Sequence, residues 1–115
     1  MSEAAMYSPI IHAAARRGIS LHRNNVGVFK DPGKGKRWIR TGLCPGSSDL
    51  IGWRTVEGKD GGAVAQFIAI EVKMANRKPT HAQAEFLNQV AEAGGLAGCV
   101  HSVDEAIELL ESGVS

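Results

Sequence analysis

The sequence contains no long apolar run, and none of its segments approaches the roughly 18 apolar residues that a membrane-spanning helix needs. Its N-terminal region lacks the basic segment followed by an apolar run that marks a secretory signal. Internal repeats and low-complexity segments are also missing. With 115 residues, 43% hydrophobic and 22% charged, the chain is expected to form a single domain over residues 1–115 and to be cytoplasmic.

Cysteine is scarce and has no metal-binding spacing. Cys44 and Cys99 stand far apart, without a C-x-x-C pair or a mixed Cys/His pattern. The four histidines do not complete a zinc ligand set either. We therefore expect two reduced, partly buried thiols and no zinc site.

Net charge is small, at +1, and by itself favours neither nucleic acid nor any other partner. The distribution is uneven, because residues 1–54 hold nine Lys/Arg against three Asp/Glu, whereas residues 55–115 hold four against nine. A basic N-terminal half is able to supply phosphate contacts. A solvated surface that is merely uneven in charge is the alternative.

The most informative stretch is Phe67–Lys73, where four apolar residues in a row end in a carboxylate and an ammonium. The apolar run predicts a strand buried on both faces. Side chains alternate along a strand, so Glu71 and Lys73 point to the same face, about 6–7 Å apart. Burying unpaired charge is costly, which leaves either a structural ion pair or a site that uses both groups.

The hydrophobic pattern predicts an α/β chain. In the N-terminal helix, Pro9 leaves two possibilities: a start at Ser8 as N-cap, or a helix from Ser2 that is kinked at Pro9. The expected elements, in chain order, are a helix over 3–17, strands over 19–23 and 26–29, a strand starting near Asp49, a strand over 64–73, a helix capped by Thr80, a strand over 96–101 and a helix capped by Ser102.

A polar, glycine-rich loop over 57–62 separates the strand that follows Asp49 from the strand that ends at Lys73. Such a loop predicts an antiparallel hairpin. Asp49, near the start of one strand, and Glu71, near the end of the next, then fall at the same end of the sheet. The hairpin would therefore gather two carboxylates and a lysine.

This group of side chains suits the hydrolysis of a phosphodiester. Mg²⁺, with Mn²⁺ as an expected substitute, binds one or two carboxylates and retains several waters. Asp49 and Glu71 would be those carboxylates, and the main-chain carbonyl of Val72 a third oxygen ligand. Lys73 would orient or deprotonate the attacking water, or neutralise charge that builds on the phosphate.

A basic turn over 30–37, flanked by Phe29 and Trp38, is interpreted as a hairpin tip that tracks a phosphate backbone, with Trp38 stacking on a base. A solvated loop with Trp38 packed on the sheet is the alternative. The expected DNA-binding residues are Arg23, Lys30, Lys34, Lys36, Arg37, Arg40, Arg77 and Lys78.

The ordered set of these motifs resembles the VRR-NUC (virus-type replication-repair nuclease) domains of the PD-(D/E)XK superfamily. The resemblance covers nearly the whole chain, although each piece alone is unspecific. The segments that carry it are Arg23-Asn24-Asn25, Gly46-Ser47-Ser48-Asp49-Leu50-Ile51-Gly52, Ile70-Glu71-Val72-Lys73, Gln83-Ala84-Glu85-Phe86 and Gly94-Gly95-Leu96-Ala97. It implies a restriction-endonuclease-like αβββαβ core with a mixed β-sheet flanked by helices, and metal-dependent DNA cleavage with Asp49, Glu71 and Lys73 at the site.

The resemblance also implies roles for two further residues. Glu3 sits where the family has an acidic residue that joins the metal site. Gln83 matches a glutamine that faces the active site, although Thr80-x-x-Gln83 is also a complete capping box. Small stand-alone viral members look like homodimers that cleave Holliday junctions in replication, repair and recombination, so a homodimer acting on branched DNA, in the host cell cytoplasm if the protein is viral, is what similarity implies.

Two competing functions remain. The first is a non-catalytic nucleic-acid-binding module, in which Glu71 and Lys73 form a structural pair. The second is a sequence-specific, restriction-type nuclease on the same core. So short a chain leaves little room for a separate element that reads base edges, which counts against the second.

Overall fold

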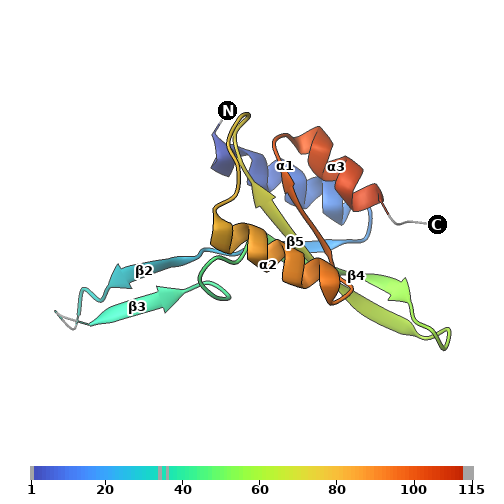
Figure 1. Ribbon diagram of the computed structural model, residues 1–115, viewed down its shortest axis with the longest axis horizontal. Helices are drawn as coiled ribbons and strands as arrows, with labels where there is room; N and C mark the ends of the chain where they lie inside the picture. The colour runs from blue at the N-terminus through green and yellow to red at the C-terminus, as the bar shows by residue number, and fades with distance from the viewer. Residues whose placement is uncertain (1, 34, 36, 113–115) are drawn as a thin grey trace.

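The computed structural model describes residues 2–33, 35 and 37–112. It has the predicted α/β class, with a mixed sheet between helices (Figure 1). The elements in chain order are α1 (Glu3–Ala15), β1 (Ser20–Arg23), β2 (Gly27–Lys30), β3 (Trp38–Thr41), β4 (Leu50–Glu57), β5 (Ala63–Val72), α2 (His81–Glu92), β6 (Leu96–Val100) and α3 (Val103–Glu111).

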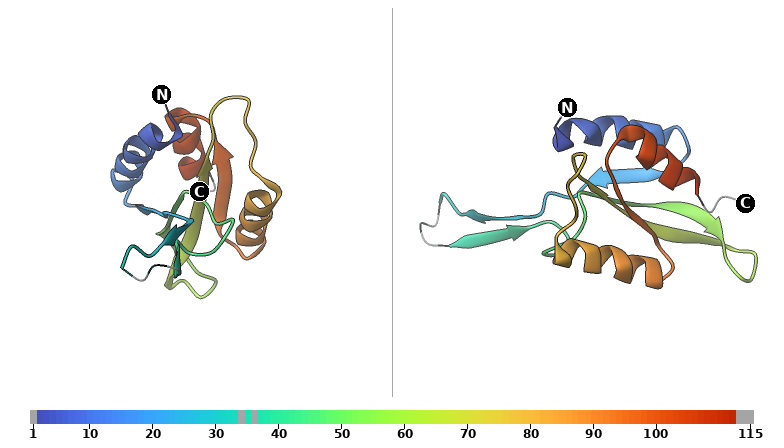
Figure 2. Two further views of the ribbon diagram at one scale, coloured as in Figure 1. Left: turned by 90° about the vertical axis from the view of Figure 1, so that its left-hand side faces the viewer. Right: turned by 45° about the horizontal axis from the view of Figure 1, so that its top comes forward.

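The main sheet has four strands in the order β1-β4-β5-β6. Strands β1, β4 and β5 are antiparallel neighbours, whereas β6 runs parallel to β5. A parallel neighbour needs a crossover connection, and α2 supplies it. Helices α1 and α3 cover one face of the sheet and α2 the other (Figures 1 and 2).

The core lies between the sheet and the pair of helices α1 and α3. The largest apolar side chains in it are fully buried: Ile10 from α1, Leu50 from β4, Ile68 and Ile70 from β5, and Leu110 from α3. The even-numbered residues of β5 share one face because side chains alternate along a strand. This packing fixes the end of β5, where Glu71 lies between two buried apolar neighbours.

The N-terminal helix begins at Glu3 and continues through Pro9. Ser2 is its N-cap, and the Ser2 side chain accepts a hydrogen bond from the Ala5 N–H at 3.2 Å. A start at Ser8 is therefore wrong, and the alternative start at Ser2 is correct. The helix ends two residues earlier than predicted, before Gly18, which has a φ of 72°.

Among the described residues, strands β2 and β3 pair only with each other and form a separate two-stranded sheet, here called the arm, which projects from the main body (Figures 1 and 2). The sequence pattern predicted β2 but missed β3, because aromatic and cationic residues interrupt the apolar pattern there. Trp38 is 64% exposed, so it is not packed on the main sheet. Lys34 and Lys36 lie outside the described residues.

The predicted N-caps Thr80 and Ser102 start both later helices, but only the Thr80 capping box is complete. Thr80 and Gln83 exchange the two reciprocal hydrogen bonds of a complete box. The Ser102 side chain accepts from the Glu105 N–H at 3.0 Å and caps α3. Both cysteines are free, with Cys44 exposed and Cys99 half-buried, so only Cys99 matches the expected partial burial. Over residues 2–33, 35 and 37–112, no helix is long and apolar enough to cross a membrane.

Candidate metal and nucleic-acid site

The hairpin of β4 and β5 brings Asp49 and Glu71 together. Its register pairs Leu50 with Ile70, so Asp49, one residue earlier, lies opposite Glu71. Residues opposite each other in an antiparallel pair share a face of the sheet. The predicted hairpin is therefore confirmed, in the register that the site requires.

Asn24 fastens the turn that presents Asp49. The buried Asn24 amide donates to the Ser47 hydroxyl and to the Ser48 carbonyl, both at 2.8 Å. Its side-chain oxygen accepts from the Leu43 N–H at 2.8 Å, and its own N–H donates to the Asp49 carbonyl at 2.7 Å. A buried amide whose hydrogen bonds are all satisfied fixes the backbone around it. The backbone of Asp49 is therefore held in place independently of the Asp49 side chain.

The Asp49 carboxylate is also held directly by β5. Its Oδ2 accepts a hydrogen bond from the Val72 N–H at 2.8 Å. This bond orients the carboxylate towards the end of the strand that carries Glu71 and the Val72 carbonyl. The structure thus brings Asp49 to the end of β5 that carries Glu71 and Val72, while metal ligation by these residues stays a prediction.

Glu71 is a buried carboxylate, one of whose oxygens lacks a hydrogen-bond partner among the described residues. It is 2% exposed, and the oxygen in question is its Oε2. Burial, and next the neighbouring Asp49 carboxylate, raise the pKa of Glu71 to about 8, whereas Lys73 opposes the shift. An unsatisfied carboxylate beside a second carboxylate is an arrangement that a bound cation would stabilise.

Lys73 lies beside the carboxylates without forming an ion pair. Lys73 is 8% exposed, and its backbone N–H donates a hydrogen bond to the Val100 carbonyl at 3.0 Å. Within the described residues, none of the ion pairs involves Lys73. The structural Glu71–Lys73 pair, which was one reading of the Glu-x-Lys sequence, is therefore not formed.

The two further residues that the resemblance implied, Glu3 and Gln83, both accept hydrogen bonds from backbone N–H groups. Glu3 Oε2 accepts from the Met74 N–H at 3.0 Å and lies 3.6 Å from Arg77 Nη1. Its charge reaches Glu71, whose pKa it raises slightly. Gln83 Oε1 accepts from the Thr80 N–H at 2.9 Å, as the capping box requires. A place for Glu3 in the metal site and a catalytic role for Gln83 remain predictions.

Tyr7 belongs to this site and was missed from the sequence. Burial, and next the charge of Asp49, raise the pKa of its hydroxyl. The Arg23 guanidinium lies 5.1 Å from the centre of the Tyr7 ring. Tyr7 occupies one of the apolar positions of the helix pattern, yet it lies one turn from Glu3 on the same helix face, a spacing that could have indicated its role.

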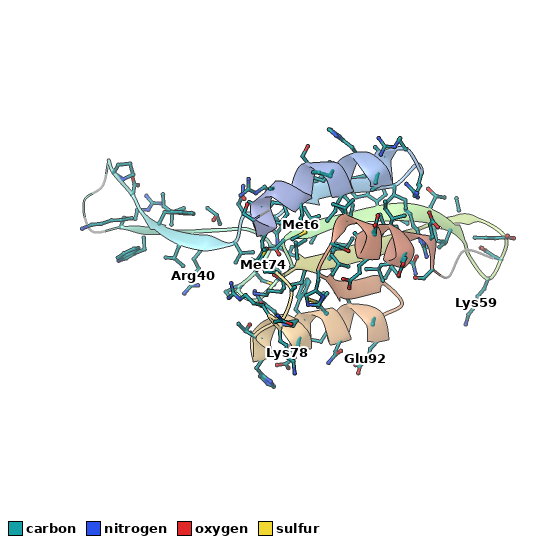
Figure 3. The ribbon with its side chains drawn as sticks, turned by 90° about the horizontal axis from the view of Figure 1, so that it is seen from above. Met6, Arg40, Lys59, Met74, Lys78 and Glu92 are labelled. Atoms are coloured by element: carbon teal, nitrogen blue, oxygen red, sulfur yellow. The ribbon has the colours of Figure 1, made fainter. Side chains whose placement is uncertain are left out.

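A cleft of about 700 Å³ opens beside Asp49. Tyr7, Arg23, Phe29 and Thr41 line it together with Asp49, so the cleft joins the Asp49 carboxylate to the base of the arm. The described cationic residues predicted to bind DNA are all exposed: Arg23, Lys30, Arg37, Arg40, Arg77 and Lys78. Figure 3 shows Arg40 on the arm and Lys78 in the main body, far from Lys59 at the opposite tip.

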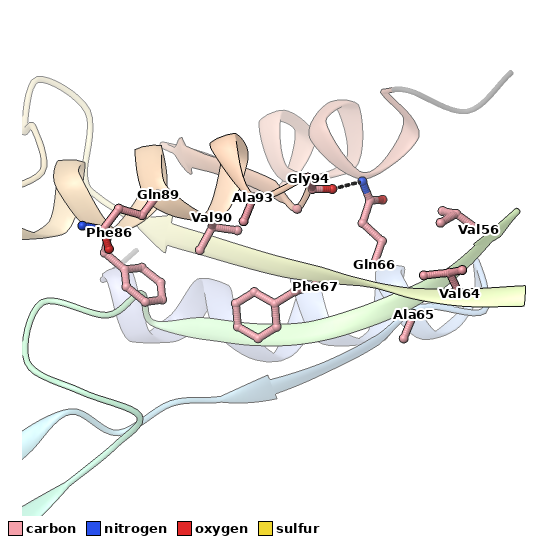
Figure 4. A pocket seen from close by; sticks show the side chains of 11 residues that line it. Val56, Val64, Ala65, Gln66, Phe67, Phe86, Gln89, Val90, Ala93 and Gly94 are labelled. Carbon is pink, nitrogen blue, oxygen red and sulfur yellow. Dashed lines mark hydrogen bonds between the residues drawn. The ribbon is translucent and has the colours of Figure 1, made fainter. Parts of the chain in front are cut away.

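A second depression lies between α2 and β5 and is of a different character. Phe67, Phe86 and Val90 line it, and its Gln66 is tied to the Gly94 carbonyl at 2.9 Å (Figure 4). No described carboxylate, lysine or arginine lines it. It therefore lacks the charged groups that phosphodiester chemistry requires.

The residues present fit Mg²⁺ better than a transition metal. Over the described part of the chain, no cluster of three or more His, Cys, Asp or Glu side chains is arranged to hold a metal ion. Zinc sites usually need three or four such side chains, whereas Mg²⁺ is commonly held by one or two carboxylates, waters and substrate phosphates. The unsatisfied Glu71 oxygen beside Asp49 meets the second requirement.

The comparison with known families agrees with this geometry. Residues 1–104 match the VRR-NUC domain, and the matched region contains the cleft, both carboxylates and Lys73. A search of curated proteins found no match. The fold is the α/β arrangement of a nuclease-type domain, and the chain belongs to the VRR-NUC family.

Proposed function

We propose that the protein is a Mg²⁺-dependent endodeoxyribonuclease that cuts branched DNA, such as Holliday junctions, in replication, repair or recombination. The observation that carries this proposal is the unsatisfied Glu71 oxygen, buried next to Asp49 at the end of an open cleft. The family match supports a nuclease-type hydrolase. The preference for branched DNA rests on the resemblance, and the cytoplasm is the proposed compartment.

The side chains would divide the chemistry as follows. Asp49, Glu71 and the Val72 carbonyl would hold Mg²⁺, or Mn²⁺ in its place, and the ion would supply Lewis-acid stabilisation of the phosphoryl oxygens. Lys73 would orient the attacking water or donate towards the phosphate. The Val72 N–H holds Asp49 in position, so little reorganisation is needed when substrate binds.

Basic residues outside the site would bind the DNA backbone. Arg23 lines the cleft, while Lys30, Arg37 and Arg40 lie on the arm. Arg77 and Lys78 precede α2 on the main body. Contacts of this kind are salt-dependent and carry little sequence information, which suits an enzyme that recognises DNA structure.

The first test compares cleavage of a labelled four-way junction, a flap and a plain duplex. With Mg²⁺, we expect the branched substrates to be cut at least about 10-fold faster than the duplex, because an exposed, basic arm suits an open junction. Chelation of the metal and the Asp49→Asn variant should each stop the reaction. Product formation on denaturing gels is the measurement.

A non-catalytic binding module predicts a different outcome. In that case wild type and Asp49→Asn would behave alike in the presence of Mg²⁺, and calorimetric titration would detect no Mg²⁺ or Mn²⁺ site. Lys73→Ala would then affect only thermal stability, through the packing of its buried side chain, and no reaction. Equal cleavage of duplex and branched DNA would instead support a nuclease but refute its preference for branched DNA.

A homodimer is the second part of this proposal. One chain presents one candidate site, and cutting two strands of a junction calls for two sites related by symmetry. Sedimentation velocity at micromolar concentration should therefore give about twice the 12.2 kDa of one chain. A species of single-chain mass, both free and bound to a junction, would contradict the dimer.

A further inference from the structure

The arm has two chemically different faces. Its register pairs Phe29 with Ile39 and, two residues away, Gly27 with Thr41. Paired residues share a face and neighbours alternate, so Val28, Lys30, Trp38 and Arg40 lie on the opposite face. Within the paired residues of β2 and β3, the Phe29 face thus carries no charge, whereas the opposite face carries Lys30 and Arg40.

The Phe29 face continues into the cleft of Asp49. Phe29 and Thr41 line that cleft together with Tyr7 and Arg23. The Phe29 side chain is nevertheless 57% exposed, so it is accessible to a ligand. An exposed aromatic ring and a nuclease carboxylate therefore share one cleft.

Gly27 determines where the ring lies. A Cβ atom at this position would lie 3.1 Å from both Cε2 and Cζ of Phe29, tighter than ordinary van der Waals contact. The ring consequently lies over Gly27, towards the base of the arm and the cleft rather than towards the tip. Because Gly27 has no side chain, the Phe29 ring can pack directly over its backbone.

The charges near this ring favour nucleic acid as its ligand. Arg23 is in the same cleft, and Lys30, Arg37 and Arg40 extend along the arm, whereas Asp31 is the one described acidic residue between 23 and 41. The Asp31 carboxylate is itself occupied by the Gly33 N–H at 2.9 Å. A cationic surface around an exposed aromatic ring is how proteins bind unpaired strands.

We propose that Phe29 stacks on an unpaired base next to the phosphodiester bound at Asp49 and Glu71, and so selects DNA with unpaired nucleotides. This inference rests on the proposed function, because it takes the cleft to be the substrate site. Bases inside a paired duplex are already stacked on their neighbours and gain nothing from the ring. Preference for branched or flapped DNA then has a physical origin in one side chain.

The test measures binding by the whole 115-residue chain in the presence of a chelator, so that no cleavage occurs. Two labelled oligonucleotides of equal length serve as ligands: a fully paired duplex, and a duplex with a short unpaired segment containing 2-aminopurine. Fluorescence anisotropy gives Kd, and 2-aminopurine quenching reports stacking. The variants are Phe29→Ala, Phe29→Leu and Phe29→Trp, with Val28→Ala as a matched control on the opposite face of the arm.

We expect Phe29→Ala and Phe29→Leu to weaken binding of the unpaired ligand by about 5- to 100-fold and to abolish the quenching. Phe29→Trp should retain both, and binding of the paired duplex should not change. Val28→Ala should match wild type. Circular dichroism verifies the fold, and Leu and Trp remain informative if the Ala variant does not fold.

Several results would overturn the inference. Phe29→Leu with wild-type affinity would mean a merely apolar contact, and equal losses on both ligands would mean no selection. A Phe29 variant that changes only the sedimentation of the protein would assign the ring to an interface between copies. Phe29-dependent binding without Mg²⁺-dependent cleavage would instead refute the nuclease while leaving the stacking intact.

Discussion

Replacing Glu71 with glutamine is expected to stop cleavage and at the same time to stabilise the metal-free protein. Loss of a carboxylate ligand should lower the rate by about 10³-fold or more, since a bound metal supplies several kcal/mol of transition-state stabilisation. Glutamine keeps the shape but removes a buried charge beside Asp49. The free energy of unfolding should rise by about 1–3 kcal/mol at pH 8.

The pH dependence of this gain follows from the raised pKa. The ordinary pKa of a glutamate is 4.5, and that of Glu71 in the folded protein is about 8. Below the lower value both states are protonated and wild type bears no penalty. As the pH rises from there through the folded pKa, only wild type loses stability, so the advantage of Glu71→Gln should grow over that range.

Thermal unfolding with and without Mg²⁺ separates the two effects. Mg²⁺ should stabilise wild type, by mass action on the folded state, and should leave Glu71→Gln nearly unchanged. Glu92→Gln, at an exposed carboxylate on α2, is the matched control and should change neither stability nor cleavage. A Glu71→Gln protein that unfolds more readily than wild type at pH 8 would refute the uncompensated-carboxylate interpretation.

The second large effect is expected at Gly52, in the middle of the sheet. This residue pairs with Leu21 where β1 approaches β4 closely. An added Cβ would overlap the Ser20 carbonyl oxygen and lie 2.8 Å from the Ser20 carbonyl carbon and 2.9 Å from Leu21 Cα. These are backbone atoms that cannot rotate away, so Gly52→Ala should cost about 3 kcal/mol or more and lower the Tm by roughly 10 °C.

Gly33→Ala is the control for this substitution. At Gly33 an added Cβ meets only an Asp31 side-chain oxygen at 3.5 Å, an ordinary contact. Its stability should therefore stay within about 0.5 kcal/mol of wild type. If Gly52→Ala unfolds at the wild-type temperature by circular dichroism, β1 does not approach β4 in the manner described.

The hairpin that carries Asp49 and Glu71 was predictable because its evidence is local. A polar, glycine-rich loop between two apolar runs specifies an antiparallel pair, and the buried run of β5 then determines the register. The helix caps Thr80 and Ser102 were predictable for the same reason. The antiparallel pairing that brings Asp49 opposite Glu71 therefore follows from patterns within short segments, whereas the αβββαβ core was implied by the family resemblance.

Tyr7, Phe29 and β3 were not predictable, because they depend on contacts between distant segments. The apolar helix pattern places Tyr7 in the core, and only the packing of α1 against the sheet end brings its hydroxyl to Asp49. Phe29 flanks a turn in the sequence, and only the register with Ile39 shows which face it shares. For β3, neighbouring charges hide the strand, and its pairing with β2 reveals it.

The separation of the arm from the main sheet has a consequence for how variants will behave. Its strands form a two-stranded sheet of their own, and an isolated two-stranded hairpin adds little to global stability. The cooperative unfolding transition of the main body is therefore largely insensitive to changes in the arm. Substitutions there will leave the melting curve almost unchanged even when they remove DNA recognition, so a screen for stability alone would score them as neutral.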